Sequence, residues 1–547
     1  MVLPAVLFSF ALIYLGFPTW DYYFDGLTFA MAVEGVAAGG DPGWLLHPHH
    51  LLYSPLAFLA YETAWALGLK IRAWLLMQWL STLCAASGLY LFYRLQRRTG
   101  IGAGAALAGI VLLGSSYSYW RFGTQGDTTM PTALLLLVVL SLAISYPGSR
   151  PMVSAAVRLG LVQGAAILLH ETAMLFIPAV AWAIWRSRRG RHRDWRPRVR
   201  AIAAFLAAVA AVAGTAYLAA TVLVLGIRSP AGFAGWLSGY FAADPRTGYA
   251  AAYGGWAGSN ISASARAWID AWFGTFSVES LPLTVAAALI AMAMLGHLPF
   301  RTIGAILAKP FRDPDRRRLT IEILLVWLVI HAVFFTWWKP GHTRFWLLAL
   351  PGWTLLIQTG LAVSGFGGRQ AALAAGERRA APAPLAMLAA GAGASWLLAV
   401  LVAAVVGLGA FRRESDPACN KFLPLSQALA ERTQENAVVI ISGVGPYTAL
   451  KAYVPYFARR NMLILDWQFA DRSVSPARAL DALRARIGRT EARVPVYLLS
   501  EVLDPGLDAH FMSVHGIAGE SRRRLFAGFR RVSEISPGLF LLASGKP

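Results

Sequence analysis

Long apolar runs constrain the fold of this chain more than any other feature of its sequence. Stretches of about 17–25 apolar residues, the length that an α-helix needs to cross a bilayer, recur from the N-terminus to about residue 410. Hydrophobic residues make up 57% of the 547 positions and charged residues only 14%, against roughly 25% charged residues in a soluble domain. A soluble globule could not bury so much apolar surface, and a disordered chain would not contain it. The sequence therefore predicts a polytopic α-helical membrane protein.

The predicted transmembrane helices number about eleven. The first, near 2–18, has no basic segment before it and no small-residue cleavage site after it, so we expect a retained helix rather than a cleaved signal. Eight further segments have the length of a span: 72–94, 101–119, 128–146, 201–225, 282–299, 319–338, 346–365 and 384–410.

Two regions leave the topology open, although both of the models that they allow have the same number of spans. Residues 51–69 either span or lie at the interface, and residues 158–185 form either one long span or two short ones broken near His170 and Glu171. An interfacial first region and a broken second one place five basic residues in the cytoplasm (Arg94, Arg97, Arg98, Arg150 and Arg158) and three outside (Lys70, Arg72 and Arg121). The opposite choices exchange the two groups. The positive-inside rule favours the first model.

The remaining basic residues follow the same rule. The run Arg186–Arg200 holds eight arginines and one aspartate, and Arg301–Arg318 and the loop with Arg369, Arg378 and Arg379 are also basic. Such runs are typical of cytoplasmic loops. The net charge of +21 therefore indicates topology, and we expect no nucleic-acid partner. The segments 19–50, 226–281, 337–345 and the chain after about 411 are then extracytoplasmic.

Hydropathy falls after Phe411, which predicts a transmembrane domain of residues 1–410 and a soluble α/β domain of residues 411–547. Three β-rich runs, Ala437–Ser442, Met462–Asp466 and Val494–Leu499, alternate with helical patterns near 446–458 and 475–488. This alternation predicts a small parallel sheet. The Gly443-Val-Gly445 turn is a weak nucleotide-binding signal, and we interpret it as a tight turn. Two cysteines, Cys84 in a span and Cys419 outside, exclude a disulfide scaffold.

The first outer loop carries acidic residues and no lysine or arginine. From Asp25 to about Ala38 its apolar spacing indicates a short amphipathic helix lying on the membrane. Asp25 stands at the start of this helix, where a carboxylate is stabilised by free amide groups. Asp25 is therefore either a simple helix cap or a general base that takes a proton from an acceptor hydroxyl. Asp21 is the second candidate for that base.

Two histidine-containing segments are further candidates. His47-Pro-His-His50 places three histidines in four residues, which is either a metal site or a polar turn ahead of an interfacial helix. His170 and Glu171 lie inside an apolar stretch, without the second histidine of a zinc-protease motif. Ionisable residues at membrane depth are costly and usually face a cavity. We expect a chain break there that places both side chains at a cavity mouth.

Two outer loops combine cations with polar groups. Asp127 precedes the span 128–146 and is either its N-cap or a site residue, while Arg121 either pairs with Asp127 or faces a phosphate. The late loop concentrates Lys339, His342 and Arg344 against the rule that keeps basic residues inside. Binding of a phosphate at the outer surface explains this departure. The alternative is interfacial snorkelling beside the neighbouring tryptophans.

Taken in order, these segments resemble the glycosyltransferase C superfamily, and within it the protein O-mannosyltransferase and aminoarabinose transferase branch. The resemblance covers roughly residues 1–365. It rests on Asp25-Gly-Leu-Thr-Phe-Ala, on His47-Pro-His-His-Leu-Leu-Tyr beside that branch's His-Pro-Pro-Leu-Tyr, on Asp127-Thr-Thr-Met-Pro, and on Lys339-Pro-Gly-His-Thr-Arg344-Phe. The chain departs from the pattern at His49, which replaces a second proline, and at His170-Glu171, where a basic residue is expected.

The resemblance implies an inverting glycosyltransferase that moves a sugar from a polyprenyl-phosphate or polyprenyl-diphosphate donor to a lipid, glycan or protein acceptor. Asp25 would deprotonate the acceptor. Arg344, with Lys339, His342 or Arg121, would stabilise the leaving phosphate. A divalent metal ion held by Asp25, Asp127 and Glu171 stays open, as does its absence. The Ala- and Arg-rich composition suggests a bacterial chain. The resemblance and the predicted topology together imply an inner-membrane protein with its active site and C-terminal domain on the extracytoplasmic side.

Three other classes of protein remain. A flippase or transporter also needs buried ionisable groups, but it predicts internal pseudo-symmetry, and we find no internal repeat in the sequence. The second is an O-antigen ligase or polymerase, a membrane enzyme of similar overall class. A non-catalytic scaffold would use the α/β domain to bind a partner.

Overall fold

The computed structural model describes residues 2–146, 152–186, 195–238, 258–274, 316–374, 384–469 and 474–544. The predicted span 282–299 and most of the predicted loop Arg301–Arg318 lie outside these ranges. The chain divides into two compact units. The membrane unit comprises Met1–Thr19, Ala32–Gly226 and Gly255–Asp416, and the α/β unit comprises Trp20–Met31, Ile227–Gly254 and Pro417–Pro547.

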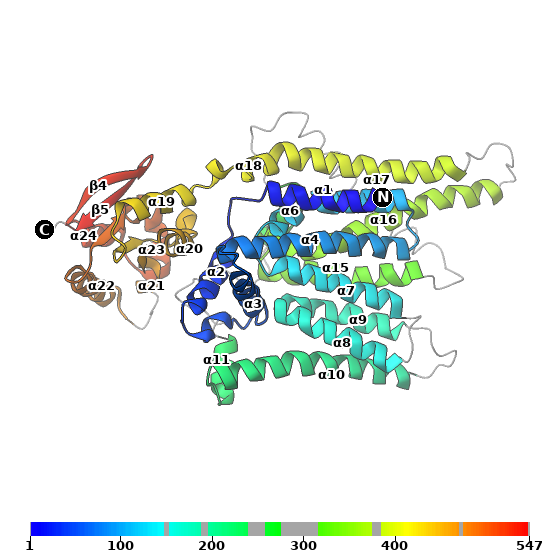
Figure 1. Ribbon diagram of the computed structural model, residues 1–547, viewed down its shortest axis with the longest axis horizontal. Helices are drawn as coiled ribbons and strands as arrows, with labels where there is room; N and C mark the ends of the chain where they lie inside the picture. The colour runs from blue at the N-terminus through cyan, green and yellow to red at the C-terminus, as the bar shows by residue number, and fades with distance from the viewer. Residues whose placement is uncertain are drawn as a thin grey trace. The chain divides into compact units, whose positions relative to one another are not determined.

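The membrane unit is a bundle of apolar helices (Figure 1). In the described part of the chain, five helices are long and apolar enough to cross a membrane: Ala73–Arg98, Met152–Leu169, Arg196–Val224, Arg317–Trp338 and Ala392–Glu414. The elements that match predicted spans are α1 (Val2–Gly16), α4 (Ala73–Arg98), α5 (Ala103–Ser115), α7 (Thr129–Ser145), α10 (Arg196–Ala219), α15 (Arg316–Trp338), α16 (Thr343–Ala374) and α17 (Pro384–Val406). The prediction of a polytopic helical membrane protein is confirmed.

The structure decides one of the two ambiguous regions. Helix α3 (Tyr53–Ala66) has 14 residues, against 13 in α5, which matches a predicted span. Length therefore does not decide between a span and an interfacial helix for 51–69, and both alternatives stay predictions. Residues 158–185 are broken at His170, whose backbone is extended between α8 (Met152–Leu169) and the 3-10 turn η3 (Glu171–Phe176) that leads into α9 (Ile177–Trp185). The two-segment alternative is confirmed.

One predicted span is shorter than expected. The segment 101–119 ends its helix at Ser115, and the short helix α6 (Tyr117–Gly123) follows. Ser116 has extended backbone angles, and its Oγ donates to Leu113 O at 2.7 Å. This local bond competes with continuation of the helix, and the sequence pattern of apolar residues does not reveal it.

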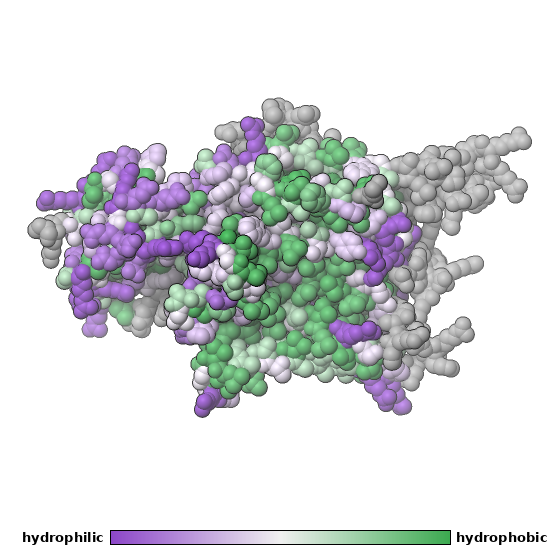
Figure 2. Space-filling view, viewed as in Figure 1, coloured by the Kyte–Doolittle hydropathy of each residue, from purple (hydrophilic) through white to green (hydrophobic). Residues whose placement is uncertain are grey.

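Close helix packing and an apolar outer surface characterise the membrane unit. A Cβ atom at Gly160 of α8 would collide with Phe205 O and Ala208 Cβ of α10, so the two backbones approach closely. Hydrophobic side chains also cover much of the helices' outward surface (Figure 2), including Leu59, Leu83, Leu161, Leu218 and Leu223. Such an apolar exterior suits lipid contact.

The α/β unit contains a five-stranded mixed sheet in the order β2-β1-β3-β5-β4. The strands are β1 (Val438–Ile441), β2 (Asn461–Ile464), β3 (Val496–Leu499), β4 (Phe529–Ser536) and β5 (Leu539–Ser544). The first three strands are parallel, as predicted. The helices include α19 (Phe422–Arg432), α20 (Leu450–Tyr453), α21 (Leu465–Gln468), α22 (Pro476–Glu491), α23 (Asp508–His515) and α24 (Gly519–Leu525).

An antiparallel hairpin that the sequence did not predict extends the parallel strands into a mixed sheet. Strand β5 pairs antiparallel with both β3 and β4. The hairpin turns at Gly538, which has φ 76°. The Pro537-Gly538 dipeptide is the turn signal that could have found it. Strand β4 has no buried residue and lacks a continuous apolar run, so hydropathy alone does not mark it.

Glu501 in the α/β unit gives a prediction about stability. Burial raises its pKa from 4.5 to about 7, although its Oε1 accepts a bond from Ser442 N–H. The folded state therefore holds this proton at higher pH than the unfolded state. Its contribution to stability is complete below pH 4.5 and is lost as the pH rises to about 7. We expect Glu501→Gln to remove about 3 kcal/mol of this pH dependence. Thermal unfolding midpoints measured across that range test this, and parallel curves for the two proteins would contradict it.

Candidate active site

Arg344 and Asp127 form the centre of the candidate site in the membrane unit. Arg344 Nε lies 3.4 Å from Asp127 Oδ1, and both side chains are almost fully buried. The guanidinium also donates to Thr129 Oγ1 and Thr128 Oγ1, at 3.0 Å each. Asp127 Oδ1 accepts from Thr129 N at 2.7 Å and from the Thr129 hydroxyl. Asp127 therefore accepts a backbone N–H at the start of α7, where Thr128 holds the N-cap position, and it also contacts a cation. A role for Asp127 in the site stays a prediction.

Two helix N-termini meet at this cluster. Arg344 is the second residue of α16, and Thr129 is the first residue of α7. Helix N-termini present free N–H groups and a positive dipole end, which favour anions. Lys339 and His342 lie on the turn just before α16, and both approach the ring of Phe345, at 6.0 Å and 5.8 Å. The predicted cations of the late loop therefore gather on one turn.

The histidine segment packs against the break in the chain at His170. His49 Nδ1 lies 2.8 Å from Glu171 Oε1, and Glu171 N donates to His49 O at 3.0 Å. The rings of His47 and His50 stack with centroids 4.3 Å apart, and His50 lies 5.4 Å from His170. Burial and then the neighbouring His47 lower the pKa of His50 well below its ordinary value. His50 is therefore a neutral imidazole.

Phe345 joins this histidine cluster to the late loop, because the His170 ring lies 6.1 Å from the Phe345 ring. The predicted residues His47, His50, His170, Glu171, Lys339, His342 and Arg344 thus belong to one connected region of the membrane unit. In the described part of the chain, the three-residue group with converging metal-type atoms lies elsewhere, at Asp466, His510 and His515.

Arg121 has a different partner from the one considered in the sequence. Its guanidinium lies 3.2 Å from Glu414 Oε2, and Glu414 Oε1 accepts from the Tyr117 hydroxyl at 2.7 Å. Glu414 is a partner that the sequence did not predict, and the two alternatives for Arg121 stay predictions.

The two candidate bases of the first outer loop, Asp21 and Asp25, belong to the α/β unit. Asp25 lies in the first turn of α2 (Phe24–Ala37) and is half-buried, whereas Asp21 is exposed. Just before this helix, Tyr22 is anchored: its N–H donates to the Tyr453 hydroxyl at 2.9 Å, and its ring stacks 5.8 Å from Phe457. Asn420 donates to Trp20 O and, at 3.1 Å, to the Tyr453 hydroxyl. The C-terminal part of the chain therefore holds the segment that leads to Asp25.

Tyr453→Phe is expected to loosen this segment. The change keeps the buried ring but leaves the Tyr22 amide without its hydroxyl acceptor, which costs about 1–3 kcal/mol. Hydrogen exchange at the Tyr22 amide should accelerate by about 10-fold or more. Tyr456→Phe, which removes the hydroxyl group of a nearby tyrosine, serves as the control. An unchanged exchange rate in Tyr453→Phe would show that the hydroxyl does not hold the loop.

Several residues of these contacts were missed in the sequence. Thr128 and Thr129 sit in an apolar helix start, and Glu414, Asn420 and Tyr453 lie far along the chain from their partners. The Asp127-Thr-Thr run was a usable signal, because two hydroxyls beside a carboxylate offer acceptors to a cation. No local pattern marks the other three.

Comparisons with known proteins agree with this architecture. No protein-family model and no curated protein matches the sequence. Among solved structures, the chain is similar to ArnT from Cupriavidus metallidurans bound to undecaprenyl phosphate, with a TM-score of 0.57 and 12% identity over 99% of this chain and 97% of that chain. Its apo state gives a TM-score of 0.57 with 13% identity over the same shares. The Archaeoglobus fulgidus oligosaccharyltransferase gives a TM-score of 0.49 and 13% identity over 100% of this chain and 74% of that chain.

The chain therefore has the fold of the glycosyltransferase C membrane enzymes, and the resemblance in its motifs is confirmed at the level of the fold. ArnT from Cupriavidus metallidurans is one solved structure that the chain matches over nearly its whole length, and that match includes the C-terminal domain.

Proposed function

We propose that this protein is an inverting glycosyltransferase that moves a sugar from a polyprenyl-phosphate donor to an acceptor at the extracytoplasmic face of a membrane. The observation that carries the proposal is the buried Arg344 at the start of α16, facing Asp127 and two threonines within a glycosyltransferase C fold. A fold alone does not fix an activity. A buried guanidinium beside two helix N-termini, with Lys339 and His342 on the adjacent turn, offers a site for a phosphate.

An apolar pocket beside the histidine segment supports a lipid-linked donor. The pocket has a volume of about 270 Å³ and is lined by leucine, alanine and valine side chains: Leu46, Leu51, Leu52, Leu168, Ala216, Ala219, Ala220, Leu223 and Val224. Leu51 directly follows His50, and Leu168 lies two residues before His170. An isoprenoid chain in such a pocket would bring its phosphate toward the polar cluster. Undecaprenyl phosphate is the ligand of the similar ArnT structure.

The proposed reaction is a single displacement. The acceptor hydroxyl transfers its proton to the Asp25 carboxylate while its oxygen bonds to the anomeric carbon. The bond between that carbon and the donor phosphate breaks from the opposite face, so the configuration inverts and polyprenyl phosphate leaves. Arg344, with Lys339 and His342, stabilises the negative charge that grows on the leaving oxygen. Asp127 orients Arg344 through the contact described above.

Turnover of a radiolabelled polyprenyl-phosphate sugar by the purified, membrane-reconstituted protein tests the proposal. The expected result is transfer of the label to an acceptor together with stoichiometric release of polyprenyl phosphate. Transport of the intact lipid across vesicles, with no cleavage of any lipid-linked sugar, would identify a flippase instead. The anomeric configuration of the product, compared with that of the donor, tests inversion separately.

A further inference from the structure

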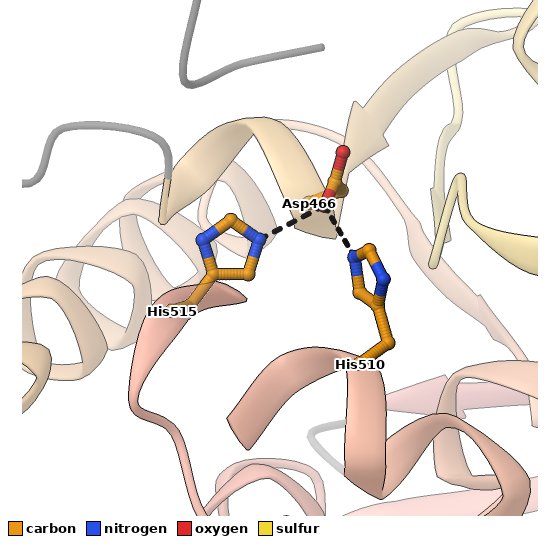
Figure 3. A group of neighbouring side chains, drawn as sticks. All are labelled: Asp466, His510 and His515. Carbon is orange, nitrogen blue, oxygen red and sulfur yellow. Dashed lines mark hydrogen bonds and ion pairs between the residues drawn. The ribbon is translucent and has the colours of Figure 1, made fainter. Parts of the chain in front are cut away.

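Three side chains converge in the α/β unit at a place that the proposed reaction does not use. Asp466 Oδ1 lies 3.1 Å from His510 Nε2 and 2.9 Å from His515 Nε2 (Figure 3). Asp466 stands in α21, directly after β2, and both histidines belong to α23. The two imidazoles point at one carboxylate oxygen, and these atoms all lie within 4.8 Å of one another.

The proton on His515 is placed by its second hydrogen bond. His515 Nδ1 lies 3.0 Å from Phe469 O, and a carbonyl oxygen only accepts, so Nδ1 carries the hydrogen. In a neutral His515 the lone pair of Nε2 then faces the lone pairs of Asp466 Oδ1. Such a pair of acceptors repels unless a positive charge lies between them. Protein-bound metal ions use this arrangement, in which the other ring nitrogen donates to a backbone carbonyl and fixes the tautomer.

We propose that Asp466, His510 and His515 bind a divalent transition-metal ion of the zinc type. Two imidazole nitrogens and one carboxylate oxygen form a recognised ligand set for zinc, with bonds of about 2.0–2.2 Å. The corresponding edge between ligand atoms in a tetrahedron is roughly 3.3 Å, so small rotations from the observed 2.9 Å and 3.1 Å accommodate the ion. The side chain of His510 is 38% exposed, which leaves the fourth position to water.

The charges around the three proposed ligands allow one cation to bind and limit its affinity. Lys451 Nζ lies 3.8 Å from Asp466 Oδ2, on the oxygen that the histidines do not approach. The positive charge of Lys451 weakens the attraction for a cation, so we expect moderate rather than extreme affinity.

The ion would fasten two parts of the fold. It would join the carboxyl end of β2 to α23, across the 44 residues that separate Asp466 from His510. Closing a loop of this length restricts the unfolded chain and stabilises the folded one. Asp466 N also donates to Ser442 O at 3.1 Å. The site thus lies at the carboxyl edge of the parallel strands, where ligands commonly bind in such sheets.

Metal content of the full-length protein, purified without a histidine tag and stripped by a chelator, tests the proposal. Zn²⁺ is titrated back, and the bound metal is counted per chain. We expect one equivalent in the α/β unit, weakened by at least about 100-fold in His510→Ala, since loss of a mere supporting partner already costs 10–100-fold. His510 is the most exposed of the three ligands, so its removal should leave folding intact. Asp466→Asn is the second variant.

The matched control is His47→Ala, because the histidine segment of the membrane unit is the other place where zinc could bind. With Co²⁺ as the probe, tetrahedral absorption bands should vanish in His510→Ala and persist in His47→Ala. Metal content that is the same in wild type and His510→Ala, in folded protein, would overturn the proposal. Wild-type protein that binds no metal in the titration would also overturn the proposal. In that case, a protonated His515 paired with Asp466 would explain the short contact between these two side chains.

Discussion

Arg344→Ala is expected to lower kcat for sugar transfer by about 10²–10³-fold with little change in KM, since removal of one preorganised charge donor typically costs that much. The physical reason is that Arg344 stabilises the transition state more than the bound substrate. The guanidinium gains most as charge accumulates on the leaving phosphate, and in the buried position of Arg344 that interaction is stronger than in water. Steady-state kinetics with a polyprenyl-phosphate sugar provide the measurement.

The single substitution also leaves Asp127 as a buried carboxylate without its cation, which alone can cost 3–5 kcal/mol of stability. A double variant, Arg344→Met with Asp127→Asn, separates the two effects. If Arg344 only neutralises Asp127, the double variant should recover activity. If Arg344 stabilises the leaving group, the double variant should fold well and stay inactive. Arg344→Lys keeps the positive charge but loses the planar guanidinium group. We expect its kcat to lie between those of the wild type and Arg344→Ala.

Asp25→Asn is the second large prediction, with an expected loss of about 10²–10⁴-fold in kcat, the usual contribution of a general base. Asparagine has nearly the same shape as aspartate, so the packing around the half-buried Asp25 should be kept and stability should change little. Binding of the donor lipid should be retained, because the base acts on the acceptor.

Asp21→Asn is the matched control, since it removes the same charge four residues earlier, at an exposed position. We expect activity close to wild type. Full activity in Asp25→Asn, with loss in Asp21→Asn, would move the base to Asp21. Full activity in both would leave Asp127 as the remaining candidate and would contradict a base on the first loop.

The transmembrane organisation was largely readable from the sequence, because hydropathy and span length follow from the bilayer itself. The segment 128–146 corresponds to α7 (Thr129–Ser145), and the segment 72–94 corresponds to the first part of α4 (Ala73–Arg98). The break at His170 was also foreseen, since ionisable side chains within an apolar run need a cavity or a chain break. The stop at Ser116 and the strand β4 were not foreseen. The first depends on one side-chain bond, and the second has no apolar face for periodicity to detect.

What the sequence determined by itself was the class of membrane protein, the chemical types in the candidate site and the parallel core of the α/β unit. Each of these depends on local composition or short spacing. Only the tertiary structure decided the pairings: Arg344 with the Asp127 segment, Arg121 with Glu414 across 293 residues, and Tyr22 with Tyr453 across 431. Local pattern fixes which face of a helix is apolar, but not which distant helix it meets. A charge finds its partner only when packing brings the two together and removes the water between them.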